Sequence, residues 1–139
     1  MRKPLFSLAA LGMAVAVAAS AQADLSPVEP EVIEVPSGQP VAFHESLLDR
    51  PAMGLTARFR FLAPELGTRI DAMSYDELEA DLFALCEGYA LPRIAAPEPS
   101  QIVISLAEAP TEFGVAAPDV VEVFEAYRPD GDTCAWEAF

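Results

Sequence analysis

The sequence predicts an α+β fold, in which one amphipathic helix packs on an antiparallel or mixed sheet of about five strands. Three observations predict this class. Short runs of alternating apolar and polar residues, which are typical of strands, come before and after a single stretch with helical periodicity. No internal repeat divides the 139 residues. Only two cysteines are present, Cys86 in the helical stretch and Cys134 in a predicted strand, and a bond between them would join helix to sheet.

The predicted helix covers residues 74–91. Ser74 and Glu77 have the spacing of a capping box, in which each side chain bonds the backbone N–H of the other residue. We expect Gly88 to take the left-handed conformation after the helix and Pro92 to prevent its continuation. Residues at steps of three and four predict one inward face, made of Tyr75, Leu78, Leu82, Leu85, Cys86 and Tyr89. Acidic residues fall mostly on the other side, namely Asp76, Glu77, Asp81 and Glu87.

The clearest strand is residues 55–62, where apolar and polar side chains alternate. Alternation places Phe59 and Phe61 on one face, and Arg58 and Arg60 on the other. Proline-rich and glycine-containing stretches separate the strands and are predicted as loops, including residues 64–72 and 92–100. The other predicted strands are a short edge strand at 31–35, a strand at 41–48 and a strand at 101–106.

Residues 119–128 fit two structures. A helical face could contain Val120, Val121, Phe124 and Tyr127, but three valines, two aromatic residues and the turn that follows favour a strand in a hairpin with residues 134–139. We favour the strand. The turn at 130–132 starts like a calcium loop but lacks its further ligands, so we interpret it as a hairpin turn. In this hairpin Cys134 and Trp136 share a face, which predicts Trp136 as a core residue.

The first 23 residues have the pattern of a secretory signal peptide. Arg2 and Lys3 precede an apolar run, and Ala21-Gln22-Ala23 provides a small-residue cleavage site. The alternative, a membrane anchor, needs a longer apolar run. We expect residues 24–30 to form a flexible leader and residues 31–139 a single domain in the periplasm or outside the cell. In an oxidising compartment Cys86 and Cys134 should form a disulfide, the alternative being two buried thiols.

The predicted mature chain is strongly acidic. Loss of Arg2 and Lys3 leaves six arginines against 22 acidic residues, which gives a formal net charge of −16. Such a chain repels phosphate backbones and anionic headgroups, so we expect no nucleic-acid partner and no membrane binding after signal cleavage. A basic protein partner or a cation would be attracted.

No catalytic, cofactor-binding or metal-binding residue is assigned. His44 is the only histidine, and glycine-rich phosphate loops and metal-ligand spacings are absent from the sequence. Arg58 and Arg60 could hold an anion, but we expect them to pair with neighbouring acidic side chains. These observations favour a small exported accessory or binding protein without catalysis. The alternative is a small periplasmic hydrolase with a site near His44, Arg58 and Arg60, with Ser46 as a further candidate.

Several phrases also resemble a known family. They are FHESLLDRPAMGLTARFRFLAPEL, MSYDELEADLFALCEGYALP, QIVISLAEAPTEFG and VFEAYRPDGDTCAWEAF. Together they resemble a family of short exported proteobacterial proteins that carry a domain of unknown function, with the C-x-W-E ending at 134–137 as the most specific part. The resemblance implies export and paired cysteines, and it transfers no activity.

Overall fold

The computed structural model describes two isolated positions and two stretches of the chain, namely Gly12, Ala14, residues 31–52 and residues 54–138. The predicted signal peptide, 1–23, and leader, 24–30, otherwise lie outside the described residues. The elements in chain order are β1 (Val32–Ile33), β2 (Val41–Asp49), β3 (Thr56–Leu62), α1 (Leu66–Arg69), α2 (Tyr75–Leu85), a π-helical turn (Cys86–Ala90), a 3-10 turn (Leu91–Arg93), β4 (Gln101–Ala107), β5 (Glu122–Asp130) and β6 (Thr133–Glu137).

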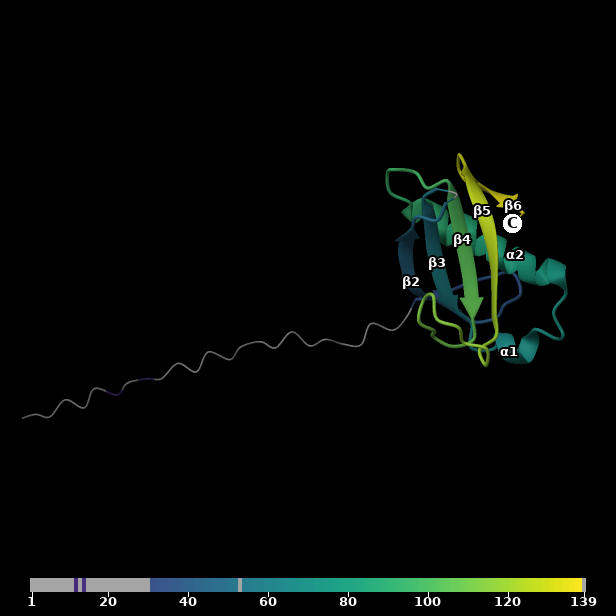
Figure 1. Cartoon of the computed structure of the whole chain (residues 1–139). Helices are drawn as coiled ribbons and strands as arrows, with labels where there is room; N and C mark the ends of the chain where they lie inside the picture. Colours follow the sequence, from purple (N-terminus) through teal and green to yellow (C-terminus); the bar gives the residue numbers. More distant parts are fainter. Residues whose placement is uncertain (1–11, 13, 15–30, 53, 139) are drawn as a thin grey trace, which may run out of the picture.

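The six strands form one mixed sheet, and α2 lies across one of its faces (Figure 1). The spatial order follows the chain, β1-β2-β3-β4-β5-β6, and every neighbouring pair is antiparallel except β3 and β4. Parallel neighbours need a long crossover connection, and residues 63–100, which contain α1 and α2, supply it. The predicted α+β class is therefore confirmed, with six strands in place of about five.

The start of α2 follows the sequence prediction. Ser74 Oγ accepts a hydrogen bond from the Glu77 N–H at 3.2 Å, and the Glu77 side chain accepts one from the Ser74 N–H at 3.0 Å. The end differs from the prediction. The α-helix gives way to the π-helical turn after Leu85, and Gly88 lies inside that turn without a positive φ. The helical path thus continues through Gly88, and both Cys86 and Ala90 face the core.

Two stretches predicted as loops contain short helices. Helix α1 lies within 64–72, where Leu66 is fully buried, and the 3-10 turn extends to Arg93. The ambiguous stretch 119–128 is mostly strand, as favoured, since β5 begins at Glu122. Its hairpin with β6 turns at Gly131, whose φ of +62° fits a glycine at the first position of a two-residue loop.

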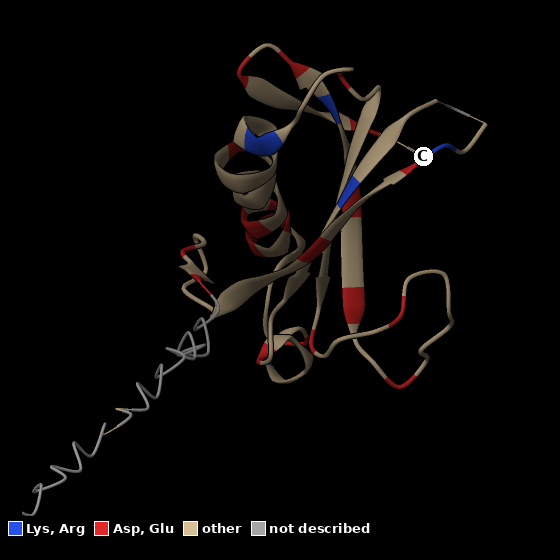
Figure 2. Ribbon diagram, turned by 90° about the vertical axis from the view of Figure 1, so that its left-hand side faces the viewer, with Lys and Arg blue, Asp and Glu red and all other residues tan. Residues whose placement is uncertain are grey.

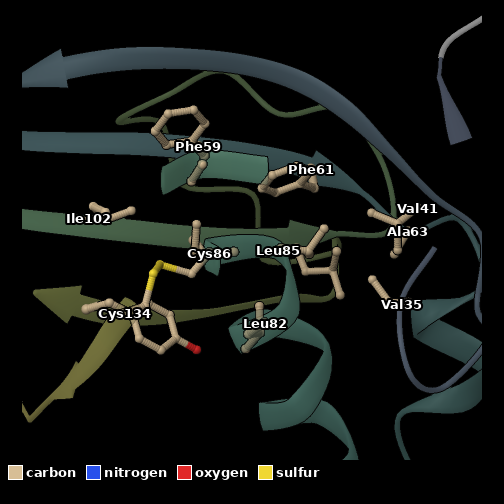
Figure 3. Packing of buried hydrophobic residues seen from close by; sticks show 14 of the residues in the cluster. Val35, Val41, Phe59, Phe61, Ala63, Leu82, Leu85, Cys86, Ile102 and Cys134 are labelled. Carbon is tan, nitrogen blue, oxygen red and sulfur yellow. A yellow bond between two sulfur atoms is a disulfide. The ribbon is translucent and has the colours of Figure 1, made fainter. Parts of the chain in front are cut away.

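The core lies between the sheet and the helical segment. Apolar side chains of β3 and β4 point toward the inner face of α2 and the π-helical turn (Figure 3). Burying each such large side chain contributes about 1.5–3 kcal/mol. The most buried side chains of this core include Phe61, Leu82, Leu85, Ile102, Ile104, Leu106 and Tyr127.

A disulfide joins the helical segment to the edge of the sheet. Cys86 and Cys134 are bonded, with a Cα–Cα distance of 6.4 Å, and both are buried (Figure 3). The backbone N–H of Cys134 also donates to Glu87 Oε1 at 3.3 Å. The π-helical turn is therefore tied to β6 twice, once covalently.

Two side chains lie opposite to their predicted positions. Asp81, predicted on the outer face of the helix, is fully buried, because the loop that follows β1 packs against α2 there. Its carboxylate accepts hydrogen bonds from the Ser37 N–H, the Ser37 hydroxyl and Gln39 Nε2 at 2.9, 2.5 and 2.8 Å. Trp136, predicted in the core, is 54% exposed. The reason is that β6 is the edge strand and is bonded to the helical segment at Cys134, two residues before Trp136.

Candidate functional site

The residues named for a hydrolase site do not converge. His44 lies at a β-bulge, where the pairing of β2 with β3 shifts between Phe43 and Glu45. Ser46 lies opposite Phe59 on the helix side of the sheet and borders a groove beside residues 93–99. Arg58 and Arg60 border a different hollow, on the other side of the sheet. In the described part of the chain the side chain of His44 forms no hydrogen bond, and His44 borders neither of these two depressions.

The two arginines pair with acidic side chains of β2, as the sequence predicted. Arg58 Nε lies 3.2 Å from Asp49 Oδ2, and Arg60 Nη1 bonds Glu45. Arg60 Nη2 also donates to the carbonyl and the hydroxyl of Thr111, at 2.8 and 2.6 Å. These contacts hold the loop after β4 against the sheet.

An acidic depression lies between α2 and β5. It has a volume of about 310 Å³. Three glutamates and no basic residue border it, and strand alternation directs the side chain of one of them, Glu122, to the opposite face of the sheet. With Trp136 at its edge, we call it the acidic-aromatic groove; its lining residues are Tyr75, Leu78, Glu79, Leu82, Glu122, Val123, Phe124 and Glu125.

A glutamate held between two aromatic residues marks one end of this groove. Tyr75 Oη donates to Glu125 Oε1 at 3.0 Å, and Trp136 Nε1 donates to Glu125 Oε2 at 2.8 Å. Three elements bring these residues together, since Tyr75 begins α2, Glu125 points to the helix side of β5 and Trp136 lies on β6. Tyr75 is 62% exposed and Trp136 54%, so both rings remain accessible. Tyr75, predicted on the inward helix face, lies instead at the surface.

The groove has a negative potential. The hydrogen bond to Glu125 raises the pKa of Tyr75, and the charges of Glu125, Glu79 and Asp76 raise it further. Burial raises the pKa of Tyr127 well above its usual value, and Glu125 and Glu79 add to this rise. Within the described ranges, no arginine forms an ion pair with the three glutamates of the groove. In Figure 2, acidic positions recur along the helix and strands, whereas basic positions are few.

The described residues show neither a metal-binding cluster nor a membrane-spanning helix. Histidine, cysteine, aspartate and glutamate do not gather there in groups of three or more that could hold a metal ion. Among the same residues, each helix is too short or too polar to cross a bilayer.

Sequence reasoning missed the groove because its parts are far apart in the chain. Tyr75 and Glu125 are separated by 50 positions, and Glu125 and Trp136 by 11. Strand alternation places Glu125 on the same face of the sheet as Tyr127. It does not predict that the first turn of α2, which contains Tyr75, lies over that face. The ending that carried the family resemblance contains both Glu125 and Trp136, and this was the available hint.

Fold and groove together define a small α+β protein with one disulfide and an acidic, partly aromatic surface groove. The chain belongs to the DUF6497 family, described as a family of unknown function, whose model matches residues 10–139. No curated protein and no solved structure matches the chain.

Proposed function

We propose that this chain is a non-catalytic accessory or binding protein whose acidic-aromatic groove binds a basic segment of a partner protein. The observation that carries the proposal is Glu125, which is fixed between the exposed rings of Tyr75 and Trp136 and has no basic side chain in the groove to neutralise it. An arginine or lysine of a partner would supply the positive charge that neutralises Glu125.

The chemistry of the groove suits such a side chain. A cation over an aromatic ring gains about 0.5–2 kcal/mol, depending on how far it is desolvated. Glu79 offers a further carboxylate, while Leu78 and Val123 offer an apolar surface for the aliphatic part of the segment. The acidic surface as a whole should also accelerate the approach of a basic partner.

The proposed setting is the periplasm or the exterior of a bacterial cell. The signal-peptide pattern of residues 1–23 supports export, and the resemblance to exported proteobacterial proteins agrees with it. The bond between Cys86 and Cys134 supports an oxidising compartment.

Non-catalytic binding is favoured over hydrolysis by the arrangement of the candidate residues. A hydrolase needs a nucleophile or base within hydrogen-bond reach of its partner. His44, Ser46 and the arginine pair border different parts of the molecule. The groove between α2 and β5, by contrast, has accessible aromatic and charged groups side by side.

The test is fluorescence anisotropy with a labelled peptide of alternating arginine and leucine. We expect saturable binding that weakens with added salt, and Glu125→Gln should weaken it about tenfold because a charge-assisted contact is lost. Glu98→Gln is the matched control, since it removes one exposed charge from the loop at 92–100. Equal weakening by the two variants would mean that net charge alone governs peptide binding, and this would contradict the proposal. The absence of binding would contradict it as well.

A further inference from the structure

Strand β2 has an open edge along most of its length. It pairs with β3 from Ala42 to Asp49, but β1 covers only its first two residues. Among the described residues, no backbone hydrogen bond joins Glu45–Asp49 to a neighbour on the side away from β3. Figure 1 shows β2 at the left margin of the sheet, and Figure 2 turns this side toward the viewer. The outward N–H and C=O groups of β2 are therefore a template onto which a further strand can add.

The usual protections of a strand edge are missing from most of this one. Proteins blunt an open edge with proline, lysine, a bulge or a covering segment. The β-bulge at His44 interrupts only the start of the open part of β2. Beyond the bulge, Glu45–Asp49 contains neither proline nor lysine. We call Glu45–Asp49 the open edge segment; its five residues have the length of an ordinary strand.

An apolar groove accompanies the open edge segment on the helix side of the sheet. Leu48 lies opposite Ala57 on that side, yet Leu48 is 71% exposed whereas Ala57 is buried. Both residues border a groove of about 280 Å³ beside residues 93–99, which contribute Ile94 and Pro97 among other apolar groups. A residue of an added strand opposite Leu48 would lie about 5 Å from it and beside this groove. The edge therefore favours an apolar side chain at that position.

A second copy of this chain does not suit the open edge segment. Two such segments related by a two-fold axis pair over their whole length only when the pairing is centred on Leu47, and this register places Glu45 opposite Asp49 at both ends. Like charges directly opposite each other destabilise a sheet. The predicted mature chains, each with a net charge of −16, would also repel each other.

The two carboxylates favour a basic partner instead. The side chains of Glu45 and Asp49 are 39% and 36% exposed, although each pairs with an arginine of β3. We propose that the open edge segment binds an extended segment of a partner protein as an added strand of the sheet. In this partner segment, basic residues lie opposite Glu45 and Asp49, and apolar residues lie opposite Ser46 and Leu48. The surface is separate from the acidic-aromatic groove, since β3 and β4 lie between β2 and β5.

The experiment follows the backbone amides by two-dimensional NMR while the end-capped peptide Lys-Leu-Thr-Leu-Lys is added at millimolar concentrations. This sequence reads the same in both directions, so it fits either orientation of the added strand. We expect saturable shifts at Ser46, Leu47 and Leu48, together with slower hydrogen exchange of the β2 amides that gain a partner. The same peptide with N-methyl groups on its three central residues lacks the backbone donors and should not bind.

Leu48→Ser should weaken peptide binding about tenfold, because the added strand loses its apolar neighbour. The variant should fold normally, since Leu48 is largely exposed. The matched control is Val115→Ser, which replaces an apolar residue that is 58% exposed in the loop after β4. Val115→Ser and Glu125→Gln should both leave binding of this peptide unchanged.

Four results would overturn the proposal. The first is the absence of saturable shifts in the open edge segment, and the second is equal binding of the N-methylated peptide. The third is wild-type affinity in the folded Leu48→Ser variant. The fourth is a set of shifts confined to Tyr75, Glu125 and Trp136, which would assign the peptide to the acidic-aromatic groove. Concentration-dependent shifts of β2 in the free protein would assign the edge to a second copy and overturn the proposal as well.

Discussion

Removal of the disulfide should cost the fold a large part of its stability. Cys86 and Cys134 are 48 positions apart, and closing a loop of that length stabilises the folded state by about 4 kcal/mol at 25 °C in the chain-entropy treatment. Both side chains are buried, so a Cys86→Ala/Cys134→Ala variant also loses the packing of two sulfur atoms, roughly 1 kcal/mol more. Small domains are stable by only about 5–15 kcal/mol, so this variant should be marginal.

Urea unfolding followed by circular dichroism measures the loss. The double variant should have a lower midpoint than the oxidised wild type. A reductant should shift the wild type toward the variant and leave the variant itself unchanged. Thiol labelling of the denatured, unreduced wild type should find no reactive thiol. Two reactive thiols per chain, or a stability loss below about 1 kcal/mol, would refute the reasoning.

Three further variants test individual contacts. Asp81→Ala removes the acceptor of three hydrogen bonds and should destabilise the fold by about 3–5 kcal/mol in urea unfolding, whereas a loss under about 1 kcal/mol would contradict the structure. Gly131→Ala places a side chain at a φ of +62° and should cost about 1 kcal/mol; an unchanged melting temperature would contradict this. Tyr127→Phe removes a buried hydroxyl that has no hydrogen-bond partner in the described chain, so stability at neutral pH should be unchanged or higher. Because folding raises the pKa of Tyr127, the wild type should lose stability above the unfolded pKa of about 10, and the variant should lose less; equal alkaline losses in melting temperature would contradict this.

Sequence patterns correctly predicted the structural features that depend on residues close together in the chain. The capping box of Ser74 and Glu77 acts within one helical turn, and strand alternation assigned Phe59 and Arg58 to opposite faces of β3. The hairpin turn at Gly131 likewise depends on a few adjacent residues.

Features that depend on distant partners were not predictable in this way. Asp81 looked like a surface residue because its partners Ser37 and Gln39 lie more than 40 positions away. Trp136 looked like a core residue because alternation gives the face of a strand but not whether a helix covers it. The bulge at His44 is equally invisible, because it changes the pairing of β2 without changing the apolar pattern.

The acidic-aromatic groove was not predicted from the sequence, and it is the centre of the proposed function. Trp136 is the only tryptophan of the chain and lies at the edge of this groove, so its fluorescence reports binding without a label. Titration with the unlabelled arginine-leucine peptide should change its emission saturably, and salt should weaken the effect. A peptide with glutamate in place of arginine should cause no change. Unchanged emission at concentrations of the basic peptide that saturate binding would contradict the assignment of the groove as its site.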